Sequence, residues 1–332
     1  MGHRKHSAPR RGSLAYRPRG RAGDFFPTVH TWPQIKGSPT LLGFPAVKVS
    51  TIHTITMDDR EKTPNFGKPR FNPTSVLAVP DTFVVGLRLY ARENGADRAL
   101  GEVYAKSLPK GVEKKSDVDP EKFIENWKQK LTGVTRMTAV VAITPRDAGL
   151  TQKKPILFEV GVGGGDIAAQ LEHVGKALGK PLKFSDVFKA GGYVDVIGIT
   201  KGQGFEGPVT RFGVKRKQHK SRKSVRAVGV IGPWHPAAVM YTIARAGQMG
   251  FHQRTETGKR ILSISNPKDA PITPNGGFEH FGEVKTDYAL LRGTVPGANR
   301  RIVVVRYPAR PNPKKKVAPV QVLEVSTRIA GR

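Results

Sequence analysis

Alternating apolar and polar residues predict β-strands along most of this chain. The pattern is clearest in AVKVSTIHTITM, residues 46–57, where β-branched and polar residues alternate. A period of two is typical of a strand with one buried face. Less regular versions of the pattern predict further strands at 74–79, 81–91, 137–144, 156–162, 193–200, 284–290, 301–307 and 320–326. This number of strands predicts a β-rich core.

Two segments have the helical period instead. The first begins with Asp119 as the N-cap and Pro120 at the first helical position, where proline is favoured. Its apolar face consists of Phe123, Ile124, Trp127 and Leu131. The second begins after Asp166, and Gly179 followed by Pro181 ends it. Its apolar face consists of Ile167, Leu171, Val174 and Leu178.

The first 37 residues show neither period. The opening MGHRKHSAPRRGSLAYRPRGRAG carries seven Lys and Arg, and no acid precedes Asp24. We interpret residues 1–37 as an extended basic arm, and a flexible basic tail is the alternative that the sequence leaves open. Four aromatic residues are expected either to stack on a partner or to anchor the arm: Tyr16, Phe25, Phe26 and Trp32.

A second basic stretch, residues 201–250, also lacks apolar periodicity. Nine Lys and Arg fall between Lys201 and Arg226, opposed only by Glu206. Such a segment cannot bury enough surface to offset its conformational entropy. We therefore expect residues 1–37 and 205–250 to be mobile in the free protein and to become ordered on an anionic partner. Whether Ala237–Ala246 forms a helix stays open.

An aromatic residue marks the far part of this stretch. Trp234 and His235 lie between Pro233 and Pro236, which makes a stiff tip. A rigid exposed indole is suited to stacking on nucleic-acid bases. A further basic run, PNPKKK at 311–316, indicates a charged loop between strands.

The overall charge points to a polyanionic partner. Lys and Arg number 56 against 26 Asp and Glu, which gives a net charge of +30 and a pI near 10.5. Nucleic acid is the favoured partner. Acidic membranes are disfavoured, because no apolar run approaches the roughly 18 residues of a membrane-spanning helix. The first thirty residues are Arg-rich without an apolar stretch, so we expect no secretory signal and a cytoplasmic location.

Catalytic chemistry finds little support in the sequence. The chain has no cysteine, which excludes disulfides, thiolate nucleophiles and Cys-type zinc sites. GVGGGD at 161–166 imitates a dinucleotide-binding turn, but Asp166 stands where a third glycine is expected and would repel a pyrophosphate. We interpret it as a capped turn. His3, His6, His219 and His235 lie in basic segments without acidic partners. We expect no catalytic residue, metal, cofactor or small-molecule substrate.

Residues 188–211, FKAGGYVDVIGITKGQGFEGPVTR, resemble the signature of the universal large-subunit ribosomal protein three family. The matching residues are Phe188, Asp195, Gly198, Thr200, Gly202, Gly204, Gly207 and Arg211. Gln203 departs from the family pattern, which has a basic residue there. The segment GPWHPAAVMYTIARAGQMGFHQRTE and the opening MGHRKHSAPRRGSLAYRPR are similar to the archaeal and eukaryotic branch. The resemblance covers essentially the whole chain.

The resemblance implies a β-rich fold built on a closed six-stranded barrel of the translation-factor type. An α/β region would be inserted into the barrel, with an extended N-terminal arm and a long basic internal loop. The implied boundaries are 1–40 for the arm, 41–80 and 185–332 for the barrel, 81–184 for the insertion and 201–262 for the loop. That loop, with Trp234, would run toward the peptidyl transferase centre.

The implied function is to bind and shape large-subunit rRNA in the cytoplasmic ribosome and to support subunit assembly, without catalysis. The implied partners are this rRNA and neighbouring large-subunit proteins, with no membrane. The predicted rRNA-binding residues are Arg4, Lys5, Arg10, Arg11, Arg17, Arg19, Lys201, Gly202, Gly204, Arg211, Lys215, Arg216, Lys217, His219, Lys220, Arg222, Lys223, Arg226, Trp234, His235 and Arg245. An enzyme modifying RNA or a nucleotide and an architectural DNA-binding protein remain the alternatives.

Overall fold

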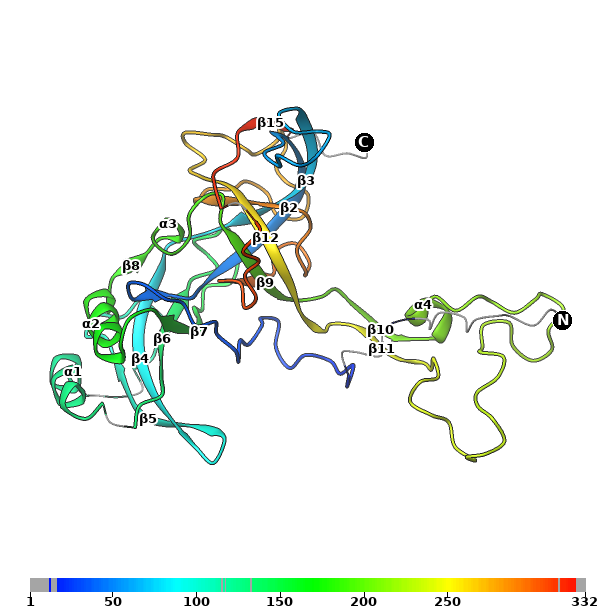
Figure 1. Ribbon diagram of the computed structural model, residues 1–332, viewed down its shortest axis with the longest axis horizontal. Coiled ribbons are helices and arrows are strands. Elements are labelled where there is room, and N and C mark those ends of the chain that lie inside the picture. Colours follow the sequence, from blue (N-terminus) through cyan, green and yellow to red (C-terminus); the bar gives the residue numbers. More distant parts are fainter. Residues whose placement is uncertain are drawn as a thin grey trace. The chain divides into compact units, whose positions relative to one another are not determined.

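The chain forms two compact units. The computed structural model describes residues 12, 17–114, 116, 118–131, 133–315 and 317–326. Residues Met1–Asp24 and Thr200–Gln253 make up one unit, here called the extension unit. Residues Phe25–Ile199 and Arg254–Arg332 make up the other, the sheet unit. Strands predominate over helices, as the alternating pattern predicts (Figure 1).

The sheet unit contains most of the regular structure. Its strands are β1 (Thr40–Leu41), β2 (Gly43–Met57), β3 (Pro69–Ala78), β4 (Thr82–Glu93), β5 (Ala96–Tyr104), β6 (Arg136–Ile143), β7 (Ile156–Gly163), β8 (Pro181–Leu182), β9 (Tyr193–Ile199), β12 (Gln253–Ser265, whose first residue belongs to the extension unit), β13 (Tyr288–Arg292), β14 (Ile302–Arg306) and β15 (Val322–Ser326). Its helices are α1 (Pro120–Gln129), α2 (Ile167–Ala177) and α3 (Phe184–Val187).

One sheet of this unit has the order β1-β7-β6-β4-β5, with β8 paired to β4. Successive residues of its central strands point to opposite sides of the sheet, and both sides are covered, so these strands are buried on both faces. On one side, Leu87 and Leu89 of β4 join a core cluster with Leu171 and Val174 of α2. Val85 lies in a separate cluster on the other side. Helix α2 packs on β4 and β6, and α1 packs on α2 (Figure 1).

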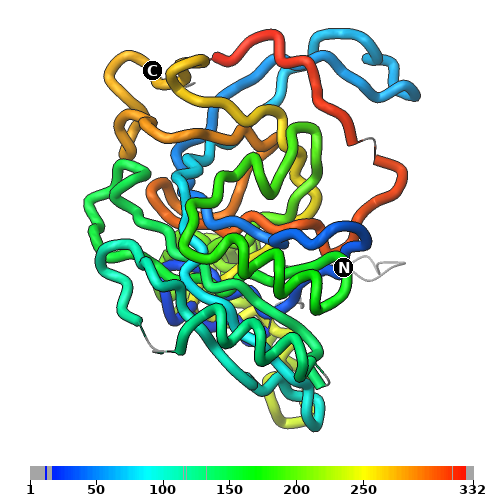
Figure 2. Tube along the Cα trace, turned by 90° about the vertical axis from the view of Figure 1, so that its left-hand side faces the viewer, coloured from blue at the N-terminus to red at the C-terminus, as the bar shows by residue number. Residues whose placement is uncertain are grey.

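The other sheet has the order β14-β9-β12-β13-β3-β2-β15, and β14 also pairs with β2. Ile302 of β14 lies opposite Val47 of β2, and Val304 lies opposite Ile197 of β9. The hydrogen-bonded neighbours of six strands therefore form a complete cycle, from β14 through β9, β12, β13, β3 and β2 back to β14. Strand β15 extends the sheet beyond β2, and Figure 2 shows this red segment beside the blue β2.

The two long predicted helices are present with their predicted starts. Helix α1 begins at Pro120 and α2 begins at Ile167, directly after Asp166. The predicted capping interaction is wrong, because neither Asp119 nor Asp166 makes a side-chain cap hydrogen bond. Leu131 lies beyond the end of α1 but still packs against the core.

Several strand predictions need correction. The strand predicted at 284–290 begins only at Tyr288, and Val284 is buried in the preceding loop. Strands β5 and β12 were not predicted. The first half of β12, QRTETGK, carries no apolar residue, and most of β5 is exposed. Both strands are therefore held by backbone pairing on a solvated surface, which leaves no hydrophobic alternation to detect.

Residues 25–39 contain no helix or strand, yet they are part of the sheet unit. Phe26 packs against one core cluster of this unit and Trp32 against another. These two aromatic residues are therefore anchors. Phe25 is 70% exposed, and its ring lies 5.9 Å from the guanidinium carbon of Arg301. Tyr16 lies outside the described residues.

The GVGGGD turn between β7 and α2 is filled by the chain itself. A Cβ atom on Gly161 would lie 2.5 Å from Cγ of Trp32, and one on Gly164 would lie 2.2 Å from the carbonyl oxygen of Ser38. These glycines make room for Trp32 and for residues 37–39, so the chain itself covers the turn. Strand β7 also pairs antiparallel with β6 and β1, unlike the parallel strands of a dinucleotide-binding fold.

Candidate nucleic-acid interface

The extension unit is held together by a short hairpin. Strand β10 (Gly202–Glu206) pairs antiparallel with β11 (Gly247–Gly250), and this pairing was not predicted. Below the hairpin, Thr200 donates its backbone N–H to the carbonyl oxygen of His252 at 3.0 Å. Phe251 donates to the carbonyl oxygen of Lys201 at 3.1 Å. The two ends of the internal loop are therefore fixed side by side.

Two glycines of this hairpin have distinct roles. Gly250 has φ +73°, and a Cβ atom there would lie 2.0 Å from the carbonyl oxygen of Lys201. Gly204 also has a positive φ, +72°, but no atom lies within 4 Å of its Cβ position. The backbone at Gly204 is thus open to close approach from outside, which suits contact with a nucleic-acid backbone.

Arg211 connects the hairpin to a short helix, α4 (Pro208–Phe212). Its Nε donates to the carbonyl oxygen of Gln248 at 3.1 Å, and its Nη1 donates to that of Arg245 at 3.1 Å. Gly247 leaves room for this guanidinium, because a Cβ there would lie 2.8 Å from Nη1. The side chain of Arg211 is therefore held in one orientation by the returning half of the loop.

The N-terminal arm lies against this same region of the extension unit. Ala22 donates its N–H to the carbonyl oxygen of Phe251 at 2.8 Å, and Nδ1 of His252 lies 2.8 Å from the carbonyl oxygen of Gly20. Arg17 donates to the carbonyl oxygen of Tyr241 and lies 5.3 Å from the centre of its ring. The two basic stretches, far apart in sequence, therefore meet in one unit.

Two guanidiniums lie over the ring of Phe212. The guanidinium carbons of Arg19 and Arg211 lie 4.6 Å and 5.2 Å from its centre. Together with Arg17 and Pro18 these residues line a cavity of about 360 Å³. Burial lowers the pKa of Arg211, and the charges of Arg19 and Arg17 lower it further. We call Arg17, Arg19 and Arg211 the arginine cluster.

The arginine cluster has little acidic compensation. Asp24 and Glu206 are the only acidic residues in the sequence of the extension unit. Guanidiniums that lie close together without a carboxylate repel one another unless an anion binds between them. Phosphate is the anion that this geometry suits, because arginine can donate two parallel hydrogen bonds to it.

Beyond α4, residues 213–246 contain no helix or strand. Ala237–Ala246 is therefore not helical. Backbone hydrogen bonds between separate parts of this segment are few. One of them joins the N–H of Lys217 to the carbonyl oxygen of Val225 at 3.0 Å. Most of the predicted rRNA-binding residues of this loop are exposed, while Lys217 is half-buried; the exposed ones are Lys215, Arg216, His219, Lys220, Arg222, Lys223, Arg226, Trp234, His235 and Arg245.

Trp234 is exposed as the sequence predicts, with 86% of its surface accessible. Three other aromatic residues of the extension unit were missed. Phe205 is 79% exposed on β10, while Phe212 and Tyr241 lie against the guanidiniums described above. All three aromatics occur in stretches without apolar periodicity. This lack of a pattern was the sequence signal that they are not buried in a core.

Four predicted binding residues, Arg4, Lys5, Arg10 and Arg11, lie outside the described residues. Within the described part of the chain, no group of three or more His, Asp or Glu could hold a metal ion. No helix in that part is long and apolar enough to cross a membrane.

Asp195, one of the signature residues, has an internal role. It is 1% exposed, and its Oδ2 lies 3.2 Å from Nη2 of Arg306 on β14. It also accepts the N–H of Gly258 at 2.9 Å and that of Ala309 at 3.0 Å. This carboxylate therefore joins β9, β12 and the end of β14 directly before the chain leaves for the extension unit.

Comparison with known proteins agrees with the signature. The family model described as Ribosomal protein L3 matches residues 1–327. A protein named Large ribosomal subunit protein uL3 from Pyrobaculum islandicum is 44% identical over 339 residues, covering 98% of this chain and 97% of the relative. One of the same name from Methanococcus vannielii is 41% identical and covers 92% of this chain and 93% of its own length. Because the family model covers nearly all of the chain and these relatives are at least 41% identical to it, this chain belongs to the ribosomal protein L3 family.

Proposed function

We propose that this chain is a structural constituent of the large ribosomal subunit that binds and shapes large-subunit rRNA and supports subunit assembly. It performs no chemical step. The observation that carries the proposal is the arginine cluster, where the arm and the internal loop bring three guanidiniums together in a unit whose sequence holds only two acidic residues. Family membership supplies the identity of the polyanion.

Charge neutralisation is the main source of binding energy in this proposal. The arginine cluster and the exposed Lys and Arg between Lys215 and Arg226 contact phosphates, and Gly202 and Gly204 allow the RNA backbone to approach. Arg4, Lys5, Arg10 and Arg11, which lie outside the described residues, are further phosphate contacts in this proposal. Because residues 213–246 have no helix or strand, the RNA determines their final path.

Trp234 is the base-contacting tip of the internal loop. With 86% of its surface accessible, it makes little contact with the protein core and presents its ring to a partner. His235 and Arg245 add polar contacts on the same loop. The loop runs toward the peptidyl transferase centre of the subunit, and neighbouring large-subunit proteins pack elsewhere on the chain.

The cycle of six strands is, in this proposal, the closed barrel of the translation-factor type. The support is that β14 pairs with both β9 and β2, which leaves no free edge among the six. Residues 41–80 and 185–332 form this barrel, 81–184 form the α/β insertion, 1–40 form the arm and 201–262 the internal loop. The barrel is the rigid anchor from which both extensions reach into RNA in the cytoplasmic ribosome.

A competition experiment tests the function. The full chain is bound to labelled large-subunit rRNA, and unlabelled rRNA or duplex DNA is added at the same salt concentration. We expect rRNA to compete at least tenfold better per nucleotide. Preference for duplex DNA would instead indicate an architectural DNA-binding protein. A parallel titration with a dinucleotide is expected to give no saturable binding, because Trp32 and residues 37–39 cover the glycine turn.

A further inference from the structure

A second basic cavity lies in the sheet unit, and two of its lining residues, Lys314 and Lys315, belong to the basic run at 311–316. Its volume is about 750 Å³, and its walls come from the turn after β2, residues 257–260 of β12, the end of β13 and the loop at 314–315. Ligand pockets typically measure roughly 300–1,000 Å³. We call it the β2–β3 turn pocket.

The wall of this pocket is a fixed ionic scaffold. The Arg260 side chain is 4% exposed, and its Nη1 donates to Oδ1 of Asp59 at 2.9 Å. Its Nη2 also donates to the carbonyl oxygen of Ala318 at 2.9 Å. This pairing lowers the pKa of Asp59, so the carboxylate is ionised and already occupied.

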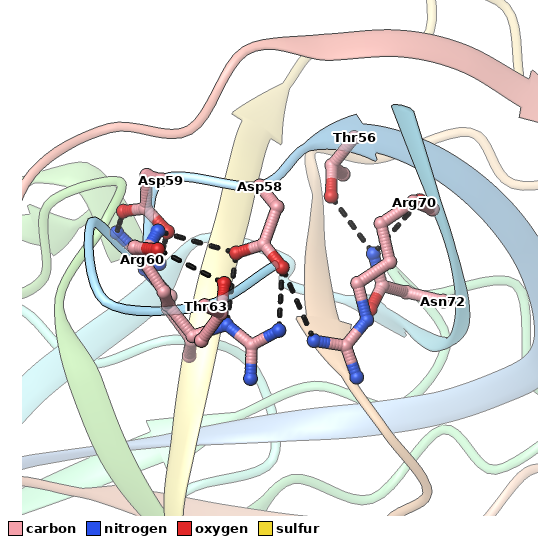
Figure 3. A network of polar contacts seen from close by, with 8 residues as sticks. Thr56, Asp58, Asp59, Arg60, Thr63, Arg70 and Asn72 are labelled. Atoms are coloured by element: carbon pink, nitrogen blue, oxygen red, sulfur yellow. Dashed lines mark hydrogen bonds and ion pairs between the residues drawn. The ribbon is translucent and has the colours of Figure 1, made fainter. Parts of the chain in front are cut away.

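The neighbouring carboxylate is occupied in the same way. Asp58, with a side chain 2% exposed, lies between the guanidiniums of Arg60 and Arg70 (Figure 3). Hydrogen bonding from Arg60 holds its pKa well below the ordinary value. Neither Asp58 nor Asp59 is therefore available to neutralise the other cations of the pocket.

Four of those cations have no acidic partner. Lys62, Arg292, Lys314 and Lys315 form no ion pair with any residue that the structure describes. The Nζ of Lys315 lies 4.8 Å from the centre of the Tyr193 ring. Burial lowers the pKa of Arg292, and the charges of Arg70 and Arg60 add to this effect. Glu61 also lines the pocket, but seven Lys and Arg against two carboxylates, Asp59 and Glu61, leave the lining with an excess of positive charge.

Two glycines let these charges come close. Gly258 has φ +67°, and a Cβ there would lie 3.2 Å from Nζ of Lys315. Gly293 has φ +88°, and a Cβ there would lie 3.3 Å from Nζ of Lys259. A side chain at either position would crowd an ammonium group. Glycine therefore leaves room for Lys315 and Lys259 at the edge of the pocket.

We propose that the β2–β3 turn pocket binds phosphate groups of an RNA strand, as a contact of the sheet unit separate from the arm and the internal loop. The proposal rests on the proposed function, because it takes the RNA as the polyanion. The pocket differs from the loop in its scaffold, because Arg260 and Asp58 are buried and paired before phosphate binds.

An acidic polypeptide is the competing occupant, and the lining disfavours it. Protein–protein contacts gain most of their energy from apolar and aromatic anchors in desolvated pockets. Tyr193 is the one large apolar surface among the lining residues, and Lys315 and Arg260 already lie over its ring. A phosphodiester backbone needs only charge and hydrogen-bond donors, which this lining provides.

The test compares two triple variants of the full chain with equal loss of charge. The pocket variant is Arg292→Gln, Lys314→Gln and Lys315→Gln. The control is Lys122→Gln, Lys130→Gln and Lys180→Gln, three exposed lysines without an ion pair in the described structure. Binding to purified large-subunit rRNA is measured over a range of salt concentrations, and thermal unfolding verifies that each variant folds.

We expect the pocket variant to bind about 10- to 100-fold more weakly near 0.1 M salt, with a log K versus log salt slope shallower by about 2. The control should change affinity by less than about threefold. A third variant, Arg292→Lys with Lys314→Arg and Lys315→Arg, keeps the charge and should recover most of the affinity. It also keeps the test decisive if the glutamine variant unfolds.

Each contrary result has its own meaning. If the wild-type chain fails to bind rRNA, both the proposed function and the pocket proposal fall. If it binds and the pocket variant behaves like the control, the pocket proposal alone is overturned. If polyglutamate binds the wild type and not the pocket variant, while both bind rRNA equally, the pocket is a site for an acidic polypeptide and not for RNA.

Discussion

At the scale of single residues, two tryptophans have opposite roles, one packed against the core and the other exposed to solvent. Trp32 fits against Gly161 and Gly43, where added Cβ atoms would lie 2.5 Å and 2.8 Å from its ring. Trp234 is 86% exposed. Both occur in stretches without apolar period, so the sequence left open whether the arm aromatics stack or anchor. Its packing against the core cluster and the room left by the glycines on β7 and β2 identify Trp32 as an anchor.

This contrast gives a matched pair of variants. Trp32→Ala should lower the free energy of unfolding by about 2–4 kcal/mol, because it leaves a cavity over two glycines. Trp234→Ala should change it by less than about 0.5 kcal/mol. In reconstituted subunits, Trp234→Ala should instead raise the chemical reactivity of the RNA bases around the loop. Unchanged reactivity with full incorporation would remove the stacking role.

At the scale of elements, the β10–β11 hairpin depends on one backbone position. Gly250→Ala would place a methyl group 2.0 Å from the carbonyl oxygen of Lys201 at a positive φ. We expect a cost of about 2–3 kcal/mol and a hairpin that opens locally. Amide hydrogen exchange of Phe205 and Gln248 is the measurement, and faster exchange is the expected result.

Gly207→Ala is the control for that variant. Gly207 lies four residues from Arg211, has φ −74°, and has no atom within 4 Å of its Cβ position. Alanine should therefore be accepted with less than about 0.5 kcal/mol of change and no faster exchange. Equal exchange in both variants would mean that the hairpin does not depend on Gly250.

The success of strand prediction depended on burial. Strand β2 was predicted nearly to its ends because Ile52 and its alternate neighbours enter the core. Strand β12 was missed because its paired but solvated half has no apolar residues, and only Ile261 and Leu262 signal a core. The basic composition of residues 201–250 predicted a loop without regular structure. It could not predict the β10–β11 pairing, because glycines carry no side-chain pattern.

At the scale of the whole molecule, several of the few carboxylates form ion pairs with arginines within the fold. The chain has 26 acidic residues against 56 basic ones, and Asp58, Asp59 and Asp195 are each held by arginines. The sequence predicted the excess of positive charge and its polyanionic partner. It could not predict which carboxylates are paired internally, because each partner arginine comes from elsewhere in the sequence or across a turn.

The stability of the fold should depend on pH because of these ion pairs. The pKa of Asp58 is depressed in the folded state, chiefly by hydrogen bonding from Arg60. The ionised carboxylate therefore contributes its full stabilisation at pH values above its unfolded-state pKa, which is near 4. This stabilisation is lost as the pH falls from there through the lower folded-state pKa. Asp58→Asn should lower the free energy of unfolding by about 1–3 kcal/mol at pH 7, with the difference shrinking toward about pH 2.

Chemical denaturation from about pH 7 to about pH 2 measures this effect. Asp81→Asn is the control, because Asp81 is exposed and forms no ion pair in the described structure, and its profile should match that of the wild type. A constant difference between Asp58→Asn and wild type at every pH would show that the carboxylate charge is not the cause.

The order of strands in the second sheet bears on how the chain is made. Strand β2 is synthesised long before two of its partners, β14 and β15. A nascent chain therefore exposes an unpaired edge of β2 until β14 and β15 have been made, and such edges favour association between chains. Truncation near the C-terminus, as after premature release, should yield an aggregating product, whatever RNA is present.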